Sequence, residues 1–391
     1  MASEPIKVTR DGQAMGEIPC ERIPLHYPNM SWRADPAIGM DARGNIYCAI
    51  RMRVFASSDG GISWKSREVD LRDAGTGLSS QAISSINVYD SFGVLRNGGL
   101  LWAYAFEGRN YLLRSGNGGK SWEPWSKIEE TSPYPSVGGN QNCITELSDK
   151  SIVWPTRLSP VLDREMGKKM KQAEQDKRWE GPPGFTTYVY RSTDMGMTWP
   201  QKAMLQPWGV ETSISELQSG RLIAAIRYQR FGYSEPPVNE PPELSETDSR
   251  SMGGVPGWVG KRVFFADSDD GGLTWKGFRP LWRKMGGEME LEFGEAHAHV
   301  AQLADGRVIV VYEHRYPHDK GGIRAKVSHD GGQTWRPEVY HLDSGSGYAA
   351  SAVLEDQTIV TICGNTPMKV DGEPTAPWQA EALRWHLPDN A

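Results

Sequence analysis

The sequence is poor in cysteine, and the few cysteines that it has are scattered. All four, Cys20, Cys48, Cys143 and Cys363, lie far apart and form no CxxC pair. Structural zinc sites and disulfide frameworks both need cysteines at close, regular spacings. We therefore expect neither a zinc centre nor a disulfide-stabilised scaffold, and no motif of the chain predicts a metal or a cofactor.

An excess of positive charge and a long apolar run are also missing. The 43 Lys and Arg residues against 49 Asp and Glu residues give a net charge of −6, which argues against nucleic acid or an anionic membrane as a partner. The chain starts MASEPIKVTRDG, without the apolar segment of a secretory signal, and has no run long enough to cross a bilayer. We expect a soluble protein that is cytoplasmic, or secreted with its signal removed.

Glycine and tryptophan are plentiful instead, and a repeated octapeptide uses both. The repeat reads Ser-x-Asp-x-Gly-x-Ser/Thr-Trp, with Asn117 in place of Asp in the second copy. Its five copies start at Ser57, Ser115, Ser192, Ser268 and Ser328. Asp and hydroxyl side chains bond the backbone of a tight turn, Gly supplies conformations that other residues disfavour, and Trp offers a large ring to bury. We interpret the repeat as a structural turn.

The spacing of the copies predicts a β-propeller, because successive starts lie between 58 and 77 residues apart, enough for one four-stranded blade with variable loops. The octapeptide resembles the Asp-box of the sialidase (neuraminidase) superfamily, whose BNR repeats mark the turns of such blades. The resemblance extends over nearly the whole chain and implies an all-β propeller. We expect it to form a single domain over residues 1–391.

The number of blades follows from the strands left over after the fifth copy. Only three strand candidates remain there, at 347–354, 358–363 and 379–387. A sixth blade therefore needs its fourth strand from the N-terminus, and residues 6–9 are the segment that we expect to supply it. Such a closure ties the ring and leaves few free strand edges.

Five hairpins of the chain align on their turns. In each, the first residue of one strand faces the last residue of the next strand, because the two run antiparallel. The positions that meet in this way are Asp35 with Arg51, Gln141 with Arg157, Glu211 with Arg227, His297 with Glu313, and Tyr348 with Gly364. Mostly polar residues at equivalent innermost positions predict a functional mouth on the face opposite the Asp-boxes.

Clustered arginines at a concave mouth favour binding of an anion, because a guanidinium group matches a carboxylate bidentately. The segments GVETSISELQSGRLIAAIR and GYAASAVLEDQTIV are similar to those that carry a Glu, an Arg and a Tyr in sialidases. This resemblance implies Tyr348 as the nucleophile, Glu211 as the base that activates it, and Arg227 as one arm of a carboxylate clamp. The implied activity is that of an exo-α-sialidase-like glycosidase.

Other parts of the family pattern are altered. Its Arg-Ile-Pro signature occurs as residues 22–24, far upstream of the first box, and the better positional match is Arg33, with one inserted residue before Pro36. No Asp stands on a loop before the first box, where the family keeps its general acid. Asp35 is our candidate for that acid, with Glu107 as the next.

Histidines occupy the segment that carries the third arginine of the family. His297 and His299 stand there, and Arg315 at the end of the same hairpin is the candidate that supplies the missing charge. The full set of substrate-binding residues that we expect is Arg227, Arg33, Arg51, Arg157, Arg315, His297, His299, Gln141 and Glu107.

Two alternatives to a sialidase-like hydrolase stay open. The first is a propeller polysaccharide lyase, or another glycosidase that acts on uronate-containing glycans. Propeller lyases move protons with His and Tyr while Arg neutralises a uronate, and His297 or His299 with Tyr348 fit that chemistry. A non-catalytic glycan-binding propeller would keep the rim and lack the general acid. In each case the expected partner is an acidic oligosaccharide or glycoconjugate. A metal at the His-x-His pair is not expected, since no spaced carboxylate completes the site.

Two long insertions, at about 160–184 and 231–260, fall between the second and third strands of neighbouring blades. The first is rich in Lys and Glu and predicts a short exposed helix, and the second is rich in Pro, Ser and Gly and predicts an extended loop. Loops of this length in a compact domain are usually functional or disordered. We expect both insertions to wall one side of the mouth.

Overall fold

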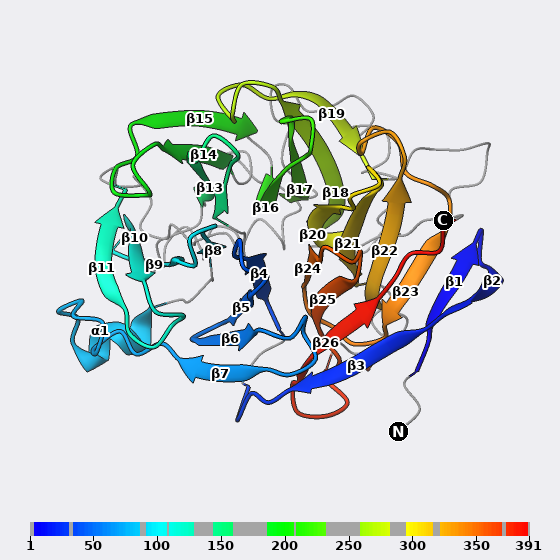
Figure 1. Ribbon diagram of the computed structural model, residues 1–391, viewed down its shortest axis with the longest axis horizontal. Helices are drawn as coiled ribbons and strands as arrows, with labels where there is room; N and C mark the ends of the chain where they lie inside the picture. The colour runs from blue at the N-terminus through cyan, green and yellow to red at the C-terminus, as the bar shows by residue number, and fades with distance from the viewer. Residues whose placement is uncertain are drawn as a thin grey trace, which may run out of the picture.

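The computed structural model describes residues 4–30, 34–86, 91–107, 109–128, 144–158, 186–206, 209–231, 259–281, 295–315, 321–369 and 373–389. Within them, six antiparallel sheets stand as blades around a central axis (Figure 1). The prediction of an all-β, six-bladed propeller is confirmed. The one helix in these residues is the short α1 (Ser80–Ser85), between the first two blades. No helix of the described chain is long and apolar enough to span a membrane.

The strands follow one another from the axis outward in each blade. Blade 1 consists of β4 (Pro36–Met40), β5 (Ile46–Ile50), β6 (Arg53–Ser57) and β7 (Lys65–Glu68). Blade 2 consists of β8 (Ser91–Val94), β9 (Leu100–Phe106), β10 (Arg109–Ser115) and β11 (Glu123–Lys127). Blade 3 consists of β12 (Thr145–Glu146), β13 (Ile152–Leu158), β14 (Thr186–Ser192) and β15 (Gln201–Gln206).

The second half of the ring repeats this order. Blade 4 consists of β16 (Gly209–Glu216), β17 (Leu222–Phe231), β18 (Val259–Ser268) and β19 (Lys276–Pro280). Blade 5 consists of β20 (Glu295–Gln302), β21 (Val308–His314), β22 (Gly322–Ser328) and β23 (Val339–Asp343), extended by β1 (Ile6–Arg10) and β2 (Gln13–Ile18). Blade 6 consists of β24 (Ala349–Val353), β25 (Ile359–Gly364), β26 (Ala380–Trp385) and β3 (Cys20–Leu25).

The N-terminus closes the last blade, as predicted, but the segment that does so differs from the prediction. β3 pairs with β26, with Cys20 opposite Trp385 and Leu25 opposite Ala380. β1, which includes residues 6–9, pairs with β23 of blade 5 instead. The prediction for residues 6–9 was wrong because the following turn folds the chain into the β1–β2 hairpin, so that the next strand, β3, reaches blade 6.

The Asp-box is a hydrogen-bonded turn between the third and fourth strands of a blade. In the first copy, Ser57 Oγ accepts the backbone N–H of Gly61 at 2.9 Å and donates to Asp59 at 2.7 Å. Asp59 also accepts the backbone N–H and the hydroxyl of Ser63, at 2.9 and 2.6 Å. The Trp64 indole N–H donates to the Gly61 carbonyl at 3.0 Å. The fourth copy makes the same contacts, so these residues serve the turn.

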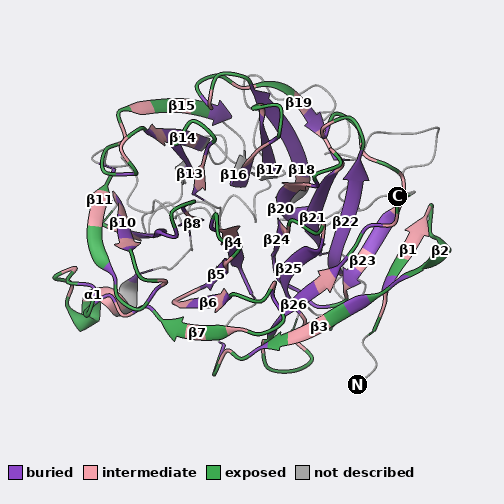
Figure 2. Ribbon diagram, viewed as in Figure 1, coloured by how far each residue is buried: buried purple, intermediate pink, exposed green. Residues whose placement is uncertain are grey.

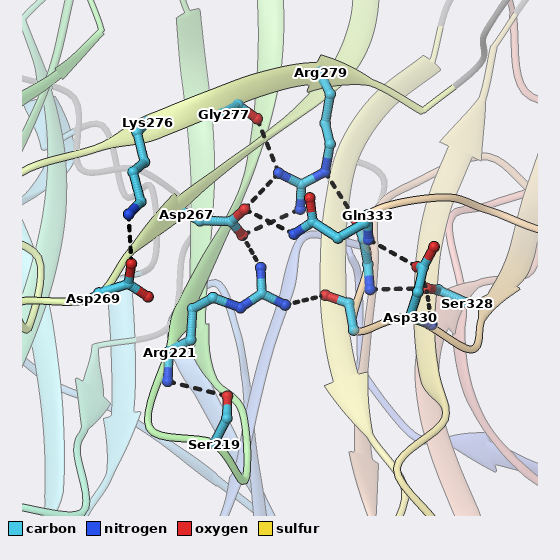
Figure 3. Close-up of polar contacts among 12 residues, drawn as sticks. Ser219, Arg221, Asp267, Asp269, Lys276, Gly277, Arg279, Ser328, Asp330 and Gln333 are labelled. Carbon is cyan, nitrogen blue, oxygen red and sulfur yellow. Dashed lines mark hydrogen bonds and ion pairs between the residues drawn. The ribbon is translucent and has the colours of Figure 1, made fainter.

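Each blade seam is sealed partly by polar contacts, which Figure 3 shows between blades 4 and 5. The buried carboxylate of Asp267 accepts hydrogen bonds from the Arg221 guanidinium, from Arg279 Nη1 at 2.8 Å and from the Gln333 amide at 2.9 Å. Arg279 Nε donates to the Gly332 carbonyl of the fifth Asp-box at 2.8 Å. Asp267 therefore couples its own blade to the box turn of the next.

The apolar core lies between neighbouring blades. Among the described residues there are six buried clusters, and each combines side chains from two adjacent sheets. Burial falls from the axis outward, and Figure 2 shows the outer strands largely exposed. The packed seams fix the inner strands, whose ends carry the predicted mouth residues.

The two predicted insertions lie between the second and third strands of blades 3 and 4, since β13 precedes and β14 follows the first, and β17 precedes and β18 follows the second. Residues 159–185 and 232–258 are outside the described residues. The predicted helix, the predicted extended loop and their place beside the mouth therefore stay predictions.

Candidate functional site

The strand pairing brings the predicted mouth residues to one face of the ring. Pro36 pairs with Ile50 and Ala349 with Cys363, which places Asp35 beside Arg51 and starts β24 directly after Tyr348. These ends lie opposite the Asp-boxes, because the boxes join the other ends of the third and fourth strands. The register deduced from the aligned turns thus agrees with the pairing in these blades.

Glu211, Arg227 and Tyr348 form one hydrogen-bonded cluster. Arg227 Nη1 donates to Glu211 Oε1 and Oε2, at 2.6 and 2.5 Å, and to the Tyr348 hydroxyl at 2.9 Å. The Tyr348 hydroxyl in turn donates to Glu211 Oε1 at 2.8 Å. The three side chains come from blades 4 and 6, which lie on either side of blade 5 in the ring. All are nearly buried, with exposed fractions of 7, 5 and 6% respectively.

Burial and the neighbouring charges set the protonation of this cluster. Burial raises the pKa of Tyr348, and the Glu211 carboxylate raises it further. The phenol is therefore neutral at rest, and it can attack only when a base takes its proton. Burial works against the charge of Arg227, but Glu211 and Tyr348 outweigh it and raise the pKa of that guanidinium. A neutral phenol, a paired carboxylate and a fixed cation are thus in contact.

His297 packs on the nucleophile candidate. Its ring is stacked on that of Tyr348, with centroids 4.7 Å apart and an interplanar angle of 17°. Ala296 pairs with Glu313 and Ala298 with Tyr312, so His297 is the extra residue of a β-bulge and has a positive φ of 32°. Such bulges redirect a side chain at the end of a strand. Burial lowers the pKa of His297 to about 4, so its imidazole is neutral at pH 7.

His299 has a structural contact. Its Nδ1 accepts the backbone N–H of Ser351 in blade 6 at 3.3 Å, which bridges β20 and β24. Burial lowers the pKa of His299 to about 3. The contact favours a positioning role over direct contact with a ligand.

Arg315 is held over the same tyrosine by a residue that the sequence reasoning did not select. Glu313 Oε2 accepts the Arg315 Nε–H at 3.0 Å, while its Oε1 accepts the Ser346 hydroxyl at 2.8 Å and the Gly347 N–H at 3.2 Å. The Arg315 guanidinium carbon lies 5.7 Å from the Tyr348 ring centroid. One carboxylate therefore fixes both the cation and the turn that leads into Tyr348. The sequence signal that could have identified Glu313 is its position opposite His297 in the aligned hairpins.

Asp35 lies next to this cluster. The Tyr348 backbone N–H donates to the Ala34 carbonyl at 2.8 Å, and Ala34 forms a parallel bridge with Gly347. The segments that lead into Asp35 and Tyr348 therefore lie side by side. Asp35 is 4% exposed, and its carboxylate lies 3.8 Å from Arg51 Nη2. The negative charge of Asp35 contributes to the raised pKa of Tyr348, after burial and Glu211. The candidate acid, Asp35, is therefore close enough to the candidate nucleophile, Tyr348, to affect its pKa.

The remaining candidates are Glu107, Arg33, Gln141 and Arg157. Glu107 is exposed at the end of β9, with a positive φ of 48° and no contact to the cluster among the described residues. Arg33 and Gln141 lie outside the described residues. Arg157 pairs through its backbone with Thr187, near the end of β13. Within the described chain, no group of three or more His, Cys, Asp or Glu side chains is placed to hold a metal ion.

Comparison with known families supports the repeat assignment. The BNR/Asp-box repeat family matches residues 326–337, which contain the whole fifth octapeptide. Among curated proteins, none is detectably similar to the chain in sequence.

Solved structures share the fold at low sequence identity. A protein of unknown function from Dyadobacter fermentans is 16% identical with a TM-score of 0.61, and the match covers 97% of this chain and 99% of that chain. A Hadza microbial sialidase is 16% identical with a TM-score of 0.55, covering 89% and 65%. The α-L-arabinofuranosidase of Fusarium graminearum, in complex with an iminosugar inhibitor, is 12% identical with a TM-score of 0.57, covering 93% and 97%. At these identities the likeness establishes the fold.

Proposed function

We propose that this sialidase-like BNR propeller is a glycoside hydrolase that removes a terminal sialic acid, a carboxylated 2-keto sugar, from a glycan. The observation that carries the proposal is the hydrogen bond from the Tyr348 hydroxyl to Glu211, with Arg227 bonded to both. A tyrosine in contact with a carboxylate base and a fixed cation is an activated nucleophile. The sialidases among proteins of this fold support the choice of substrate.

The first chemical step would form a covalent sugar–enzyme bond. As the Tyr348 oxygen attacks the anomeric carbon, its proton passes to Glu211, 2.8 Å away. Arg227 Nη1 already donates to that oxygen at 2.9 Å and stabilises the charge that develops on it. The leaving glycan takes a proton from an acid, for which Asp35 is the candidate. A neutral nucleophile avoids repulsion by the carboxylate that the substrate carries beside its anomeric carbon.

The second step would release the sugar. Water attacks the anomeric carbon and gives a proton to the acid that was consumed, while the bond to Tyr348 breaks and its oxygen recovers the proton from Glu211. Two displacements at one carbon give net retention of configuration. Arg315, held over the Tyr348 ring by Glu313, and Arg227 supply the positive charge that binds the substrate carboxylate.

A polysaccharide lyase is the second candidate, and the stacking of His297 on Tyr348 favours it. Burial keeps that imidazole neutral at pH 7, so it has a lone pair with which to accept a proton. The hydrolase is preferred because the base in hydrogen-bond contact with the Tyr348 hydroxyl is Glu211.

One incubation separates the two reactions. The protein is mixed in parallel with 3′-sialyllactose and with trigalacturonate, and the products are weighed by mass spectrometry. Hydrolysis gives free sialic acid and lactose, whose summed mass includes one added water. Release of an unsaturated uronate, which adds no water, would show that the protein is a lyase and not a hydrolase. Affinity for either probe without any product would favour a glycan-binding propeller.

A further inference from the structure

A cleft on the outer wall of the ring lies apart from the mouth. It has a volume of about 640 Å³, and residues of β11 and β15 line it. These are the outer strands of blades 2 and 3, which are neighbours in the ring (Figure 1). Strands β9, β10 and β14 and the third Asp-box also contribute to its lining. None of the residues of the proposed active site lines this cleft.

Aromatic rings make up much of the surface of the cleft, which is lined among others by Tyr104, Tyr111, Trp125, Tyr190 and Trp199. Both indoles are fixed by hydrogen bonds across the seam between the blades. The Trp125 N–H donates to the Met195 carbonyl at 2.9 Å, and the Trp199 N–H donates to Ser126 Oγ at 3.2 Å. The two rings are therefore held in place before any ligand arrives, which reduces the entropy lost on binding.

The rings and the cations form a mixed surface. The Arg114 guanidinium carbon lies 4.4 Å from the Trp125 ring centroid, so a ligand reaches that ring at its edge or its other face. Lys127 and Lys202 are exposed and line the cleft. Lys202 Nζ lies 4.0 Å above the Tyr188 ring. No Asp or Glu is among the residues that line this cleft, so the charged side chains of its lining, Lys127 and Lys202, are both cations.

We propose that this cleft is a second glycan site, which binds a carboxylated sugar residue away from the reaction at Tyr348. The C–H bonds of a pyranose face carry partial positive charge and pack on the negative face of an aromatic ring. A carboxylate on the same sugar is matched by Lys127 and Lys202, and Thr198 adds a hydroxyl. A concave, mainly apolar site with few polar groups is the usual form of a ligand pocket.

The reason for such a site would be retention on a polymeric or clustered substrate. A second contact with the same glycan raises the local concentration of its other ends at the mouth. The inference does not depend on the reaction at Tyr348, because the cleft would bind the sugar whether the mouth hydrolyses, eliminates or only binds.

The test uses the full chain labelled with 5-fluorotryptophan. The ¹⁹F signals of Trp125 and Trp199 are assigned from Trp125→Phe and Trp199→Phe, and the labelled protein is titrated with 3′-sialyllactose, trigalacturonate or neutral maltotriose. We expect both signals to shift in a saturable way with at least one acidic probe, and the responding probe tells a sialic acid from a uronate. The double variant Lys127→Gln/Lys202→Gln should weaken this binding about fivefold.

Lys120→Gln is the matched control, since this exposed lysine lies in the second Asp-box and does not line the cleft. It should leave the affinity unchanged. Unmoved signals with both acidic probes would overturn the proposal. Equal shifts with maltotriose, or an unchanged affinity in the double lysine variant, would overturn the assignment of a carboxylated sugar.

Discussion

Replacing Tyr348 with Phe should reduce the catalytic rate strongly while leaving the fold almost unchanged. The change removes one oxygen, which donates to Glu211 and accepts from Arg227. The ion pair between those two residues, at 2.5 Å, does not need that oxygen. The ring that stacks on His297 is also retained. The geometry therefore predicts a folded protein that lacks its nucleophile.

The expected magnitudes differ for folding and for rate. Loss of the hydroxyl removes two buried hydrogen bonds but leaves Glu211 paired, so the free energy of unfolding should fall by about 1 to 2 kcal/mol. Turnover should fall at least about a hundredfold, which corresponds to about 2.7 kcal/mol of transition-state stabilisation. KM should change little, because the arginines that bind the substrate carboxylate remain.

The assay is release of sialic acid from 3′-sialyllactose, with kcat and KM measured separately and folding followed by thermal melting. Tyr340→Phe is the matched control, because Tyr340 is a buried tyrosine of blade 5 outside the described cluster. It should keep full turnover. Wild-type kcat in Tyr348→Phe would refute the nucleophile, and an equal loss in Tyr340→Phe would trace the effect to folding.

Three further predictions concern stability and the long insertion. Asp267→Ala leaves two partly or fully buried arginines without their carboxylate partner at the seam of blades 4 and 5. It should lower the free energy of unfolding in urea by about 3 to 5 kcal/mol. Burial lowers the pKa of His299 to about 3, so the unfolded chain takes up the proton first as the pH falls below 6.5; the melting temperature should drop from pH 6.5 towards 4, and less so in His299→Gln. Phe231 pairs with Val259, so a short Gly-Ser turn in place of residues 232–258 should preserve the melting temperature and weaken binding of 3′-sialyllactose.

Each of these has its own contradicting result. Asp269→Ala removes an exposed ion pair with Lys276 and should lower the free energy of unfolding by less than about 1 kcal/mol. An equal loss in Asp267→Ala and Asp269→Ala would show that burial of the Asp267 ion pairs adds nothing to stability. Identical pH slopes in wild type and His299→Gln would exclude that imidazole as the source. Loss of a cooperative melt after the loop replacement would show that the insertion contributes to folding.

The repeat made the architecture readable from sequence. Five copies of one turn marked five blades, and the hairpin register predicted from the sequence brings Glu211 and Arg227 together. The choice of closing strand failed because β3, which reads CERIPL, contains a proline and two charged residues and has no clear strand pattern, whereas the IKVTR of β1 was the only strand candidate near the N-terminus. Only the turn between β1 and β2 decides which of them reaches blade 6.

Contacts of the site were harder to predict from the sequence where they join different blades or depart from regular strand pairing. The hydrogen bond between Glu211 and Tyr348 joins residues 137 positions apart, and only the resemblance pointed to it. The bulge at His297 shifts the pairing by one residue, which an alignment of turns does not reveal. Glu313 was passed over because a buried acid at a strand end has no local pattern that shows its two partners, Arg315 and the turn before Tyr348.

The most direct measurement is covalent trapping of the nucleophile. The protein is incubated with a sialyl fluoride that carries a second fluorine at C3, which slows release of the sugar from the enzyme, and its intact mass is then recorded. The account predicts a gain of one fluorosialyl group, which peptide mapping places on Tyr348, and no gain in Tyr348→Phe. A protein that cleaves 3′-sialyllactose but acquires no adduct, or acquires one on another residue, would contradict it.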